Sequence, residues 1–278
     1  MTNFDSKKWL DEKADELPKK EGINLAEWSN DPIAISYGGG TNSTAMLIGL
    51  YEKELKVDLI LFSDTGGERP DTYVFIDIFN KWLIEHEMPE IIFVKHPKET
   101  LEENCIRNKY LPSLAYGYKS CSDHFKLRPQ WKYKKKRFEA ELKNGQRIAE
   151  YVGFDAGEFH RMKFFETKQR HTEYPLVYWG WDRDKCVEKI REHGLPQPKK
   201  SACFFCPAMK KNEVKQLAKV FPELAERAIK MEENAELTSI KGLGRNYAWK
   251  DLINADEQQE SLFDESGIEL ICDCYDGE

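Results

Sequence analysis

The sequence predicts an α/β fold in which a parallel β-sheet carries helices on both faces. Three short runs rich in β-branched and aromatic residues, at 33–37, 59–63 and 91–95, alternate with two segments of helical apolar spacing near 43–54 and 73–87. Apolar strands that alternate with amphipathic helices form βαβ units, and their parallel strands are covered on both sides. Ligands bind such sheets at the carboxyl ends of the strands. We therefore expect a three-layer domain with its functional loops at that edge.

The composition is that of a folded protein without a membrane segment. The chain has 278 residues, of which 40% are hydrophobic and 12% aromatic, enough for a substantial core. The formal net charge of -7 argues against general adhesion to nucleic acid. No apolar run reaches the ~20 residues that a membrane span needs, and the first residues lack the apolar core of a signal peptide. We therefore expect a cytoplasmic protein with no membrane partner.

Three glycines follow the first predicted strand and lead into the first predicted helix. Glycine permits positive φ and close backbone approach, and the polar residues after it, from Thr41 to Thr44, can cap the helix. Such a loop presents backbone N–H groups at a helix N-terminus, which suits phosphate; a plain tight turn is the alternative interpretation. The candidate nucleotide-binding residues of this loop and the strand before it are Ser36, Gly38, Gly39, Gly40, Thr41, Asn42 and Ser43.

Two further polar segments follow predicted strands. The run 63–68, after the second strand, contains Asp64, Thr65 and Glu68. Another strand is expected at 147–154, and Glu158 and Arg161 come after it, one helical turn apart. Both segments belong at the carboxyl ends of strands, so we expect them in the ligand site; for Glu158 and Arg161 a surface ion pair is the alternative.

The glycine loop resembles the pyrophosphate loop, or PP-loop, of the adenine nucleotide α-hydrolase superfamily. The pattern of that superfamily is Ser-Gly-Gly-x-Asp-Ser, and positions 38–43 of this chain read Gly-Gly-Gly-Thr-Asn-Ser. Gly38 thus replaces the serine and Asn42 replaces the aspartate, which leaves the backbone amides to cradle phosphate. The loop lacks the Gly-Lys-Ser/Thr ending of P-loop ATPases and the glycine spacing of dinucleotide-binding folds.

Two other runs resemble the phosphoadenosine phosphosulfate (PAPS) reductase-like branch of the superfamily. The run 64–72 resembles the loop beside the nucleotide in PAPS reductases, and 153–161 matches a Gly-x-x-x-x-Glu-x-x-Arg run of their relatives. The resemblance implies a Rossmann-like fold that binds ATP, or a related adenylate, with Mg²⁺. It implies nucleotide contacts for Asp64 and Thr65. The implied catalytic residues are Asp64, Glu68, Glu158 and Arg161.

Among the seven cysteines, Cys203 and Cys206 form a CxxC of the shape that metal sites favour. In a reducing compartment, cysteines serve as metal ligands or nucleophiles more often than in disulfides. The arrangement resembles adenylyl-sulfate reductases, in which a cysteine pair, a lysine and a proline precede a CxxC and hold a [4Fe-4S] cluster. Ser122 stands where the second cysteine of the pair would be, so Cys186 is the expected substitute. The implied ligands are Cys121, Cys186, Cys203 and Cys206, with Zn²⁺ or no metal as the alternatives.

A basic segment follows Cys121. Between Lys126 and Arg147 nine residues are basic and two are acidic, in a chain that is acidic overall. Such a cluster suits phosphate or nucleic acid, and a solvated helix face is the competing interpretation. The candidate nucleic-acid contacts are Lys132, Lys134, Lys135, Lys136 and Arg137.

The sequence predicts three parts: a helical extension at 1–30, a nucleotide-binding α/β domain at 31–175, and a helical, cysteine-containing part at 176–278 packed on it. The sequence assigns no role to Cys272 and Cys274. It also does not choose between a homo-oligomer and an association with a partner protein.

The resemblance implies a PAPS reductase-like ATP pyrophosphatase that acts in sulfur transfer or adenylation, similar to the iron-sulfur enzymes of DNA phosphorothioation and tRNA thiolation. PAPS reductases end in a Glu-Cys-Gly-Leu-His motif, and nothing like it occurs here. PAPS reduction, with Cys272 or Cys274 as the nucleophile, is therefore the second hypothesis. The third is a nucleotide-sensing subunit without turnover, because Gly38 and Asn42 depart from the PP-loop pattern.

Overall fold

The computed structural model describes residues 30–112, 119–163 and 166–255. The expected extension at 1–30, apart from its last residue, and both Cys272 and Cys274 lie outside this part of the chain. The described chain divides into two compact units. The first comprises the described residues up to Thr100 together with Cys121–Cys203, and the second comprises the described parts of 101–120 and of the chain from Phe204 onward. Residues 176–203 thus belong to the first unit, whereas the sequence-based division assigned them to the C-terminal part.

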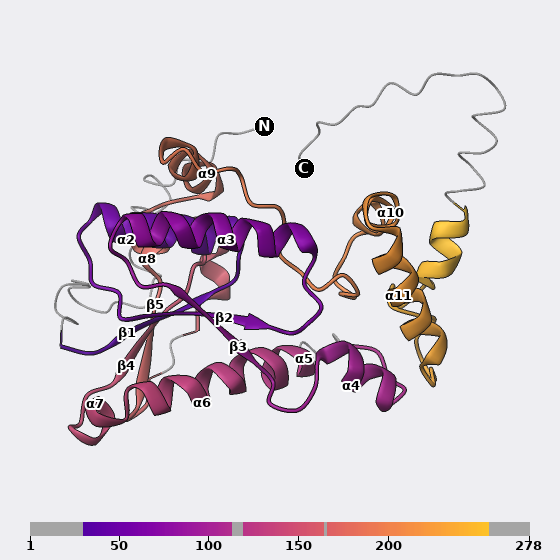
Figure 1. The fold of residues 1–278 in the computed structure, drawn as a ribbon, viewed down its shortest axis with the longest axis horizontal. Coiled ribbons are helices and arrows are strands. Elements are labelled where there is room, and N and C mark those ends of the chain that lie inside the picture. Colours follow the sequence, from indigo (N-terminus) through magenta and orange to yellow (C-terminus); the bar gives the residue numbers. More distant parts are fainter. Residues whose placement is uncertain (1–29, 113–118, 164–165, 256–278) are drawn as a thin grey trace. The chain divides into compact units, whose positions relative to one another are not determined.

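A five-stranded parallel sheet forms the centre of the first unit (Figure 1). The strand order is β3-β2-β1-β4-β5, and every neighbouring pair is parallel. This arrangement confirms the predicted α/β fold. The strands are β1 (Ile33–Tyr37), β2 (Leu59–Asp64), β3 (Ile91–Lys95), β4 (Ile148–Tyr151) and β5 (Arg170–Glu173).

Helices cover both faces of the sheet, as Figure 1 shows for α2 and α3 on one side and α6 and α7 on the other. On the first face, α2 (Thr41–Glu52) and α3 (Pro70–Glu85) bury an apolar core against alternate residues of β1 and β2, including Ile35 and Phe62. On the opposite face, Ala34 and Leu61 pack with Phe138. The helices there are α6 (Arg128–Arg137) and α7 (Glu139–Lys143).

Shorter elements complete the first unit. The segment before α6 is helical too, with α5 (Ser120–Ser122) and a π-helical turn, η3 (Asp123–Leu127). After β4 comes a 3₁₀ helix, η4 (Ala156–Arg161). After β5 come α8 (Pro175–Tyr178) and α9 (Arg183–Glu192). Helix α9 packs on α2, and Trp179 and Trp181 lie so close to Gly49 that a β-carbon there would lie 2.5 Å from the Trp179 ring.

The described part of the second unit consists of helices joined by turns. They include α4 (Leu101–Arg107), α10 (Lys211–Val220) and α11 (Pro222–Asn234), and residues 249–255 are helical as well. Pro222 separates α10 from α11, because proline cannot donate the backbone hydrogen bond of a helix interior. The buried Glu232 carboxylate accepts the backbone N–H groups of Leu243 and Trp249 and so anchors the chain after α11. No helix in the described part of the chain is long and apolar enough to cross a membrane.

Candidate nucleotide-binding site

The glycine loop lies where the strand order of the sheet reverses. Strand β1 is flanked by β2 on one side and by β4 on the other. Doubly wound sheets bind ligands in the crevice at this position, outside the carboxyl ends of the strands. The loop after β4 packs directly on the start of α2: a β-carbon on Gly153 would lie 3.0 Å from the Cα of Ser43.

Gly39 and Gly40 differ in backbone conformation and surroundings, and a β-carbon on Gly38 would meet only Oγ of Ser43, at 3.8 Å. Gly39 has a φ of +72°, and a β-carbon on it would lie 3.2 Å from Cγ2 of Thr72, so both its conformation and its surroundings require glycine. Gly40, the N-cap of α2, has an ordinary φ of -109°, and no described atom lies within 4 Å of a β-carbon built on it. Gly40 therefore faces open space.

That open space is suited to an anion. The N-cap of α2 has no side chain to accept the first N–H groups of the helix, and the first turn contains no acidic residue. The amides and the positive end of the helix dipole are then available to negative charge. The hydroxyls around them shape the loop, because Ser43 and Thr44 donate to the Gly40 carbonyl at 3.2 and 2.9 Å, and Thr41 accepts from Gln197 at 2.7 Å.

The Asn42 amide joins three charged residues beside this helix N-terminus. Its Nδ2 donates to Oδ2 of Asp155 at 2.8 Å and to Oε2 of Glu158 at 3.0 Å, while its Oδ1 accepts from Arg183 at 2.9 Å. Arg161 pairs with Glu158 and lies over the Phe154 ring, 4.4 Å from its centroid. Glu158 therefore lies beside the glycine loop with Arg161 paired to it, and their role in a ligand site stays a prediction.

Sequence reasoning did not include Asp155 and Arg183 among the site residues. Asp155 is buried, and its carboxylate also accepts the backbone N–H of Glu158, which caps η4. A polar residue directly after a predicted strand was the signal that could have identified it. The sequence around Arg183 carries no comparable signal. Arg183 reaches Asn42 because α9 packs on α2.

Asp64 holds the loop after β2 in shape. Its Oδ1 accepts from the Tyr73 hydroxyl at 2.7 Å and from the Gly66 amide at 2.8 Å, and its Oδ2 lies 3.0 Å from the Lys95 ammonium. Burial raises the pKa of Asp64, but these hydrogen bonds and the Lys95 charge outweigh burial and lower the pKa below its ordinary value. Both carboxylate oxygens are thus engaged by protein groups, and the roles of Asp64 in nucleotide binding and catalysis stay predictions.

This lowered pKa predicts an acid-dependent contribution to stability. The contribution is present above the unfolded pKa of about 3.9 and is lost as pH falls through the lower folded pKa. Asp64→Asn should therefore lower the free energy of unfolding by about 1–3 kcal/mol at pH 7 and by less at pH 3. Urea unfolding at both pH values measures it. Asp77→Asn, an exposed position on α3, is the matched control. An equal loss at both pH values would contradict the prediction.

Glu68 and Thr65 meet the segment that contains Cys203. Glu68 and Cys203 pair as an isolated antiparallel bridge, and Sγ of Cys203 lies 3.1 Å from Oγ1 of Thr65. The Glu68 carboxylate is buried, with Lys126 at 3.1 Å and Ser201 at 3.4 Å. The four predicted catalytic residues thus fall into two groups, with Glu158 and Arg161 beside Asn42, and Asp64 and Glu68 in the loop after β2.

The structure does not bring the four predicted cysteine ligands together. Among the described residues, no group of three or more His, Cys, Asp or Glu side chains is arranged to hold a metal ion. Cys186 lies in the apolar core, where burial, with the Asp155 charge as a smaller cause, raises the pKa of its thiol to about 12. Cys186 as a ligand of a [4Fe-4S] cluster or of Zn²⁺ stays a prediction, because a bound metal itself favours the thiolate. Cys121 and Cys206 are half-buried, and Cys206 belongs to the second unit.

Of the five basic residues of α6 predicted to contact nucleic acid, one is buried. Lys134 is only 2% exposed, and its ammonium lies 2.8 Å from Glu150 and 3.0 Å from the Ser36 hydroxyl. The expected nucleic-acid contact through Lys134 is therefore wrong. Ser36, a predicted nucleotide-binding residue, also donates to Gln130 at 2.6 Å and so is tied to α6. The other four candidates remain exposed, namely Lys132, Lys135, Lys136 and Arg137.

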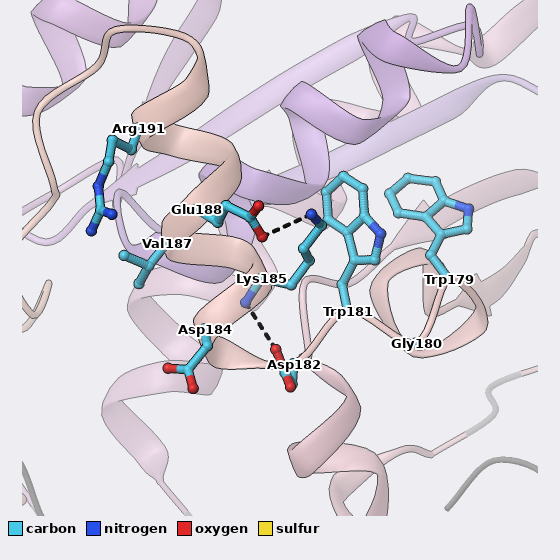
Figure 2. Close-up of a pocket in the computed structure, with 9 residues that line it drawn as sticks. All are labelled: Trp179, Gly180, Trp181, Asp182, Asp184, Lys185, Val187, Glu188 and Arg191. Carbon is cyan, nitrogen blue, oxygen red and sulfur yellow. Dashed lines mark hydrogen bonds and ion pairs between the residues drawn. The ribbon is translucent and has the colours of Figure 1, made fainter. Parts of the chain in front are cut away.

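A groove lies on α9, and its lining residues differ from those of the candidate nucleotide site. It encloses about 730 Å³ and is formed by Trp179–Asp182 and the outer residues of α9 (Figure 2). Within it, the Lys185 ammonium pairs with Glu188 at 2.7 Å, and the Lys185 backbone N–H donates to Asp182 at 2.8 Å. None of the predicted site residues lines it.

Comparison with known proteins finds distant relatives. No family model matches the chain. Two curated relatives, both uncharacterized proteins of Methanocaldococcus jannaschii, are 27% identical over 216 residues and 24% identical over 242 residues, covering 73% and 84% of this chain. The chain spans about half the length of these relatives, 42% and 55% respectively.

Two solved structures are similar at a TM-score of 0.41 each. One is a phosphoadenylyl-sulfate (PAPS) reductase from Candida auris in complex with phosphate, with 18% identity over 71% of this chain and 90% of that chain. The other is the U34-tRNA thiolase NcsA from Methanococcus maripaludis with its [4Fe-4S] cluster, with 15% identity over 98% of this chain and 84% of that chain. Likenesses this distant do not assign an activity.

Proposed function

We propose that the chain is a PAPS reductase-like enzyme of the PP-loop superfamily that cleaves ATP between its α- and β-phosphates, in the service of adenylation or sulfur transfer. The glycine loop carries this proposal: it lies at the strand-order reversal of a doubly wound sheet, with Gly40 facing open space at the start of α2. This is the position at which such sheets bind phosphates.

The proposed chemistry uses backbone amides and two arginines. The N–H groups at the start of α2 hold the pyrophosphate part of ATP, which enters as its Mg²⁺ complex. An acceptor oxygen attacks the α-phosphorus, forms a new P–O bond and breaks the bond to the bridging oxygen, which leaves with pyrophosphate. Arg161 and Arg183, held beside the loop by Glu158 and Asn42, offset the negative charge that develops. The acceptor is water in the absence of another substrate.

A nucleotide-sensing subunit is the second candidate, and the geometry of Asn42 favours it. Its amide is engaged by two carboxylates and one guanidinium, so it is held in place by the protein. A locked amide at the position of the family's aspartate suits binding without turnover. PAPS reduction would need the nucleophile Cys272 or Cys274, which lie outside the described residues.

The purified chain, incubated with ATP and Mg²⁺, should release pyrophosphate and AMP in equal amounts. Coupled pyrophosphate detection and nucleotide chromatography measure both products. The Gly40→Val variant should release neither and serves as the control for a contaminating enzyme. Tight ATP binding without any product would replace the proposal by the sensing subunit. Thiol-dependent release of sulfite from PAPS would replace it by the reductase.

A further inference from the structure

A second, smaller pocket opens where β3 ends and α6 begins. It encloses about 230 Å³, and its lining combines four basic side chains with two prolines. We call it the β3–α6 pocket. Its lining residues are His96, Pro97, His124, Arg128, Pro129 and Lys132. None of them belongs to the glycine loop or contacts Asn42 in the described structure, so this pocket is separate from the proposed nucleotide site.

Three of the four basic residues form a ridge along one helical face. His124, Arg128 and Lys132 follow each other at intervals of four residues through η3 and α6. Residues four apart lie on the same side of a helix, about 6 Å from one another along its axis, so the charges of Arg128 and Lys132 repel each other. Asp123 offsets part of this charge, at 2.7 Å from Arg128 and 3.6 Å from His124. The pocket lining itself contains no acidic residue.

His96, which also lines the pocket, has a buried ring nitrogen. It directly follows β3, and its ring lies 4.7 Å from that of Phe125. Its Nδ1 is buried and has no hydrogen-bond partner among the described residues. Buried polar atoms in folded proteins nearly always have a partner, so a donor or acceptor from a ligand is the natural complement of this nitrogen.

We propose that the β3–α6 pocket binds a phosphate group. A phosphate has enough oxygens to accept hydrogen bonds from Arg128, Lys132 and the imidazoles together. The planar guanidinium of Arg128 can donate to two phosphate oxygens at once. Arg128 and Lys132 place two permanent positive charges at the pocket, in a chain whose net charge is -7. The phosphate belongs either to a small ester or to a polynucleotide strand, whose next phosphate would reach Lys136, one turn further along α6.

The first test uses inorganic phosphate and the full chain. Side-chain NMR resolves the histidine imidazoles, of which the chain has six. Added phosphate should shift the signals of His96 and His124, assigned by His96→Gln and His124→Gln. Arg128→Gln with Lys132→Gln should weaken this binding at least tenfold, since each removes a charge-assisted hydrogen bond. Lys136→Gln, which removes an exposed charge outside the pocket, should leave it unchanged.

Two results would overturn the proposal. One is the absence of any shift of His96 and His124 in the folded wild-type chain up to molar phosphate. The other is equal binding by the Arg128/Lys132 variant. Failure of this proposal can be told apart from failure of the proposed nucleotide function. The Gly40→Val variant should lose ATP binding and keep the phosphate-induced shifts of His96 and His124.

A second arm distinguishes the source of the phosphate. A fluorescent single-stranded oligonucleotide is titrated with wild-type chain at several salt concentrations. If a polynucleotide strand is bound, Lys136→Gln should weaken binding and reduce the salt slope by roughly 0.7. If a small ester is bound, Lys136→Gln should change nothing and inorganic phosphate alone should saturate the pocket.

Discussion

Valine at position 40 should abolish ATP binding while the protein stays folded. Gly40 has an extended backbone that valine adopts readily, and its β-carbon would meet no described atom within 4 Å, so the side chain would project into the space assigned to phosphate. We expect isothermal calorimetry to detect no ATP binding. The free energy of unfolding should fall by no more than about 1 kcal/mol, the cost of a poorer N-cap.

Gly39→Val provides the contrast to this variant. Its positive φ and the nearby Thr72 methyl make valine strained there, so the fold itself should lose about 1–3 kcal/mol. Loss of binding in Gly39→Val alone would reflect a distorted loop. If Gly40→Val binds ATP with the affinity of the wild type, the glycine loop is not the phosphate site.

Replacement of Lys134 by methionine should cause the largest loss of stability, about 3 kcal/mol at neutral pH. The ammonium is buried between α6 and the sheet, where it bonds Glu150 and Ser36. Removal of one partner of a buried ion pair leaves the other charge uncompensated and costs about 3–5 kcal/mol. We expect the lower end of that range because Arg170 still lies 3.0 Å from Glu150. Urea unfolding monitored by circular dichroism measures the change.

The control for this prediction is a neighbouring lysine of α6. Lys136→Met removes the same charge from an exposed position and should change stability by no more than about 0.5 kcal/mol. Combining Lys134→Met with Glu150→Gln should restore part of the loss, because the unpaired carboxylate is then absent. Equal stabilities of the two lysine variants would mean that Lys134 is not buried in solution.

Asn42 occupies the position where the PP-loop pattern has an aspartate, and the charged residues around it explain this difference. An aspartate at position 42 would face Asp155 and Glu158 within hydrogen-bonding distance, and three carboxylates at that spacing repel one another. The asparagine amide donates to both carboxylates and accepts from Arg183 with its oxygen. The substitution therefore matches the charges around it.

Several features of this protein were determined by the sequence alone, because their signals are local. Strands β1 and β3 begin and end where the apolar runs predict, and β2 is one residue longer. The triple glycine between a strand and a helix predicts a positive φ in this loop, and Gly39 has it. The break between α10 and α11 follows from Pro222. In each case the residues that carry the signal are neighbours in the chain.

Other features were decided only by the tertiary structure, because their partners are distant in sequence. Strand β5 reads Arg-His-Thr-Glu, without the apolar alternation of a strand, and it forms by pairing with β4. The lysines of α6 look alike in sequence, and the helical period turns Lys134 towards Glu150 on the sheet while its neighbours face solvent. Arg183 reaches Asn42 across 141 positions, and Cys186 is enclosed by the core of α2 and α9. Side-chain surroundings of this kind follow from long-range packing, which no local pattern encodes.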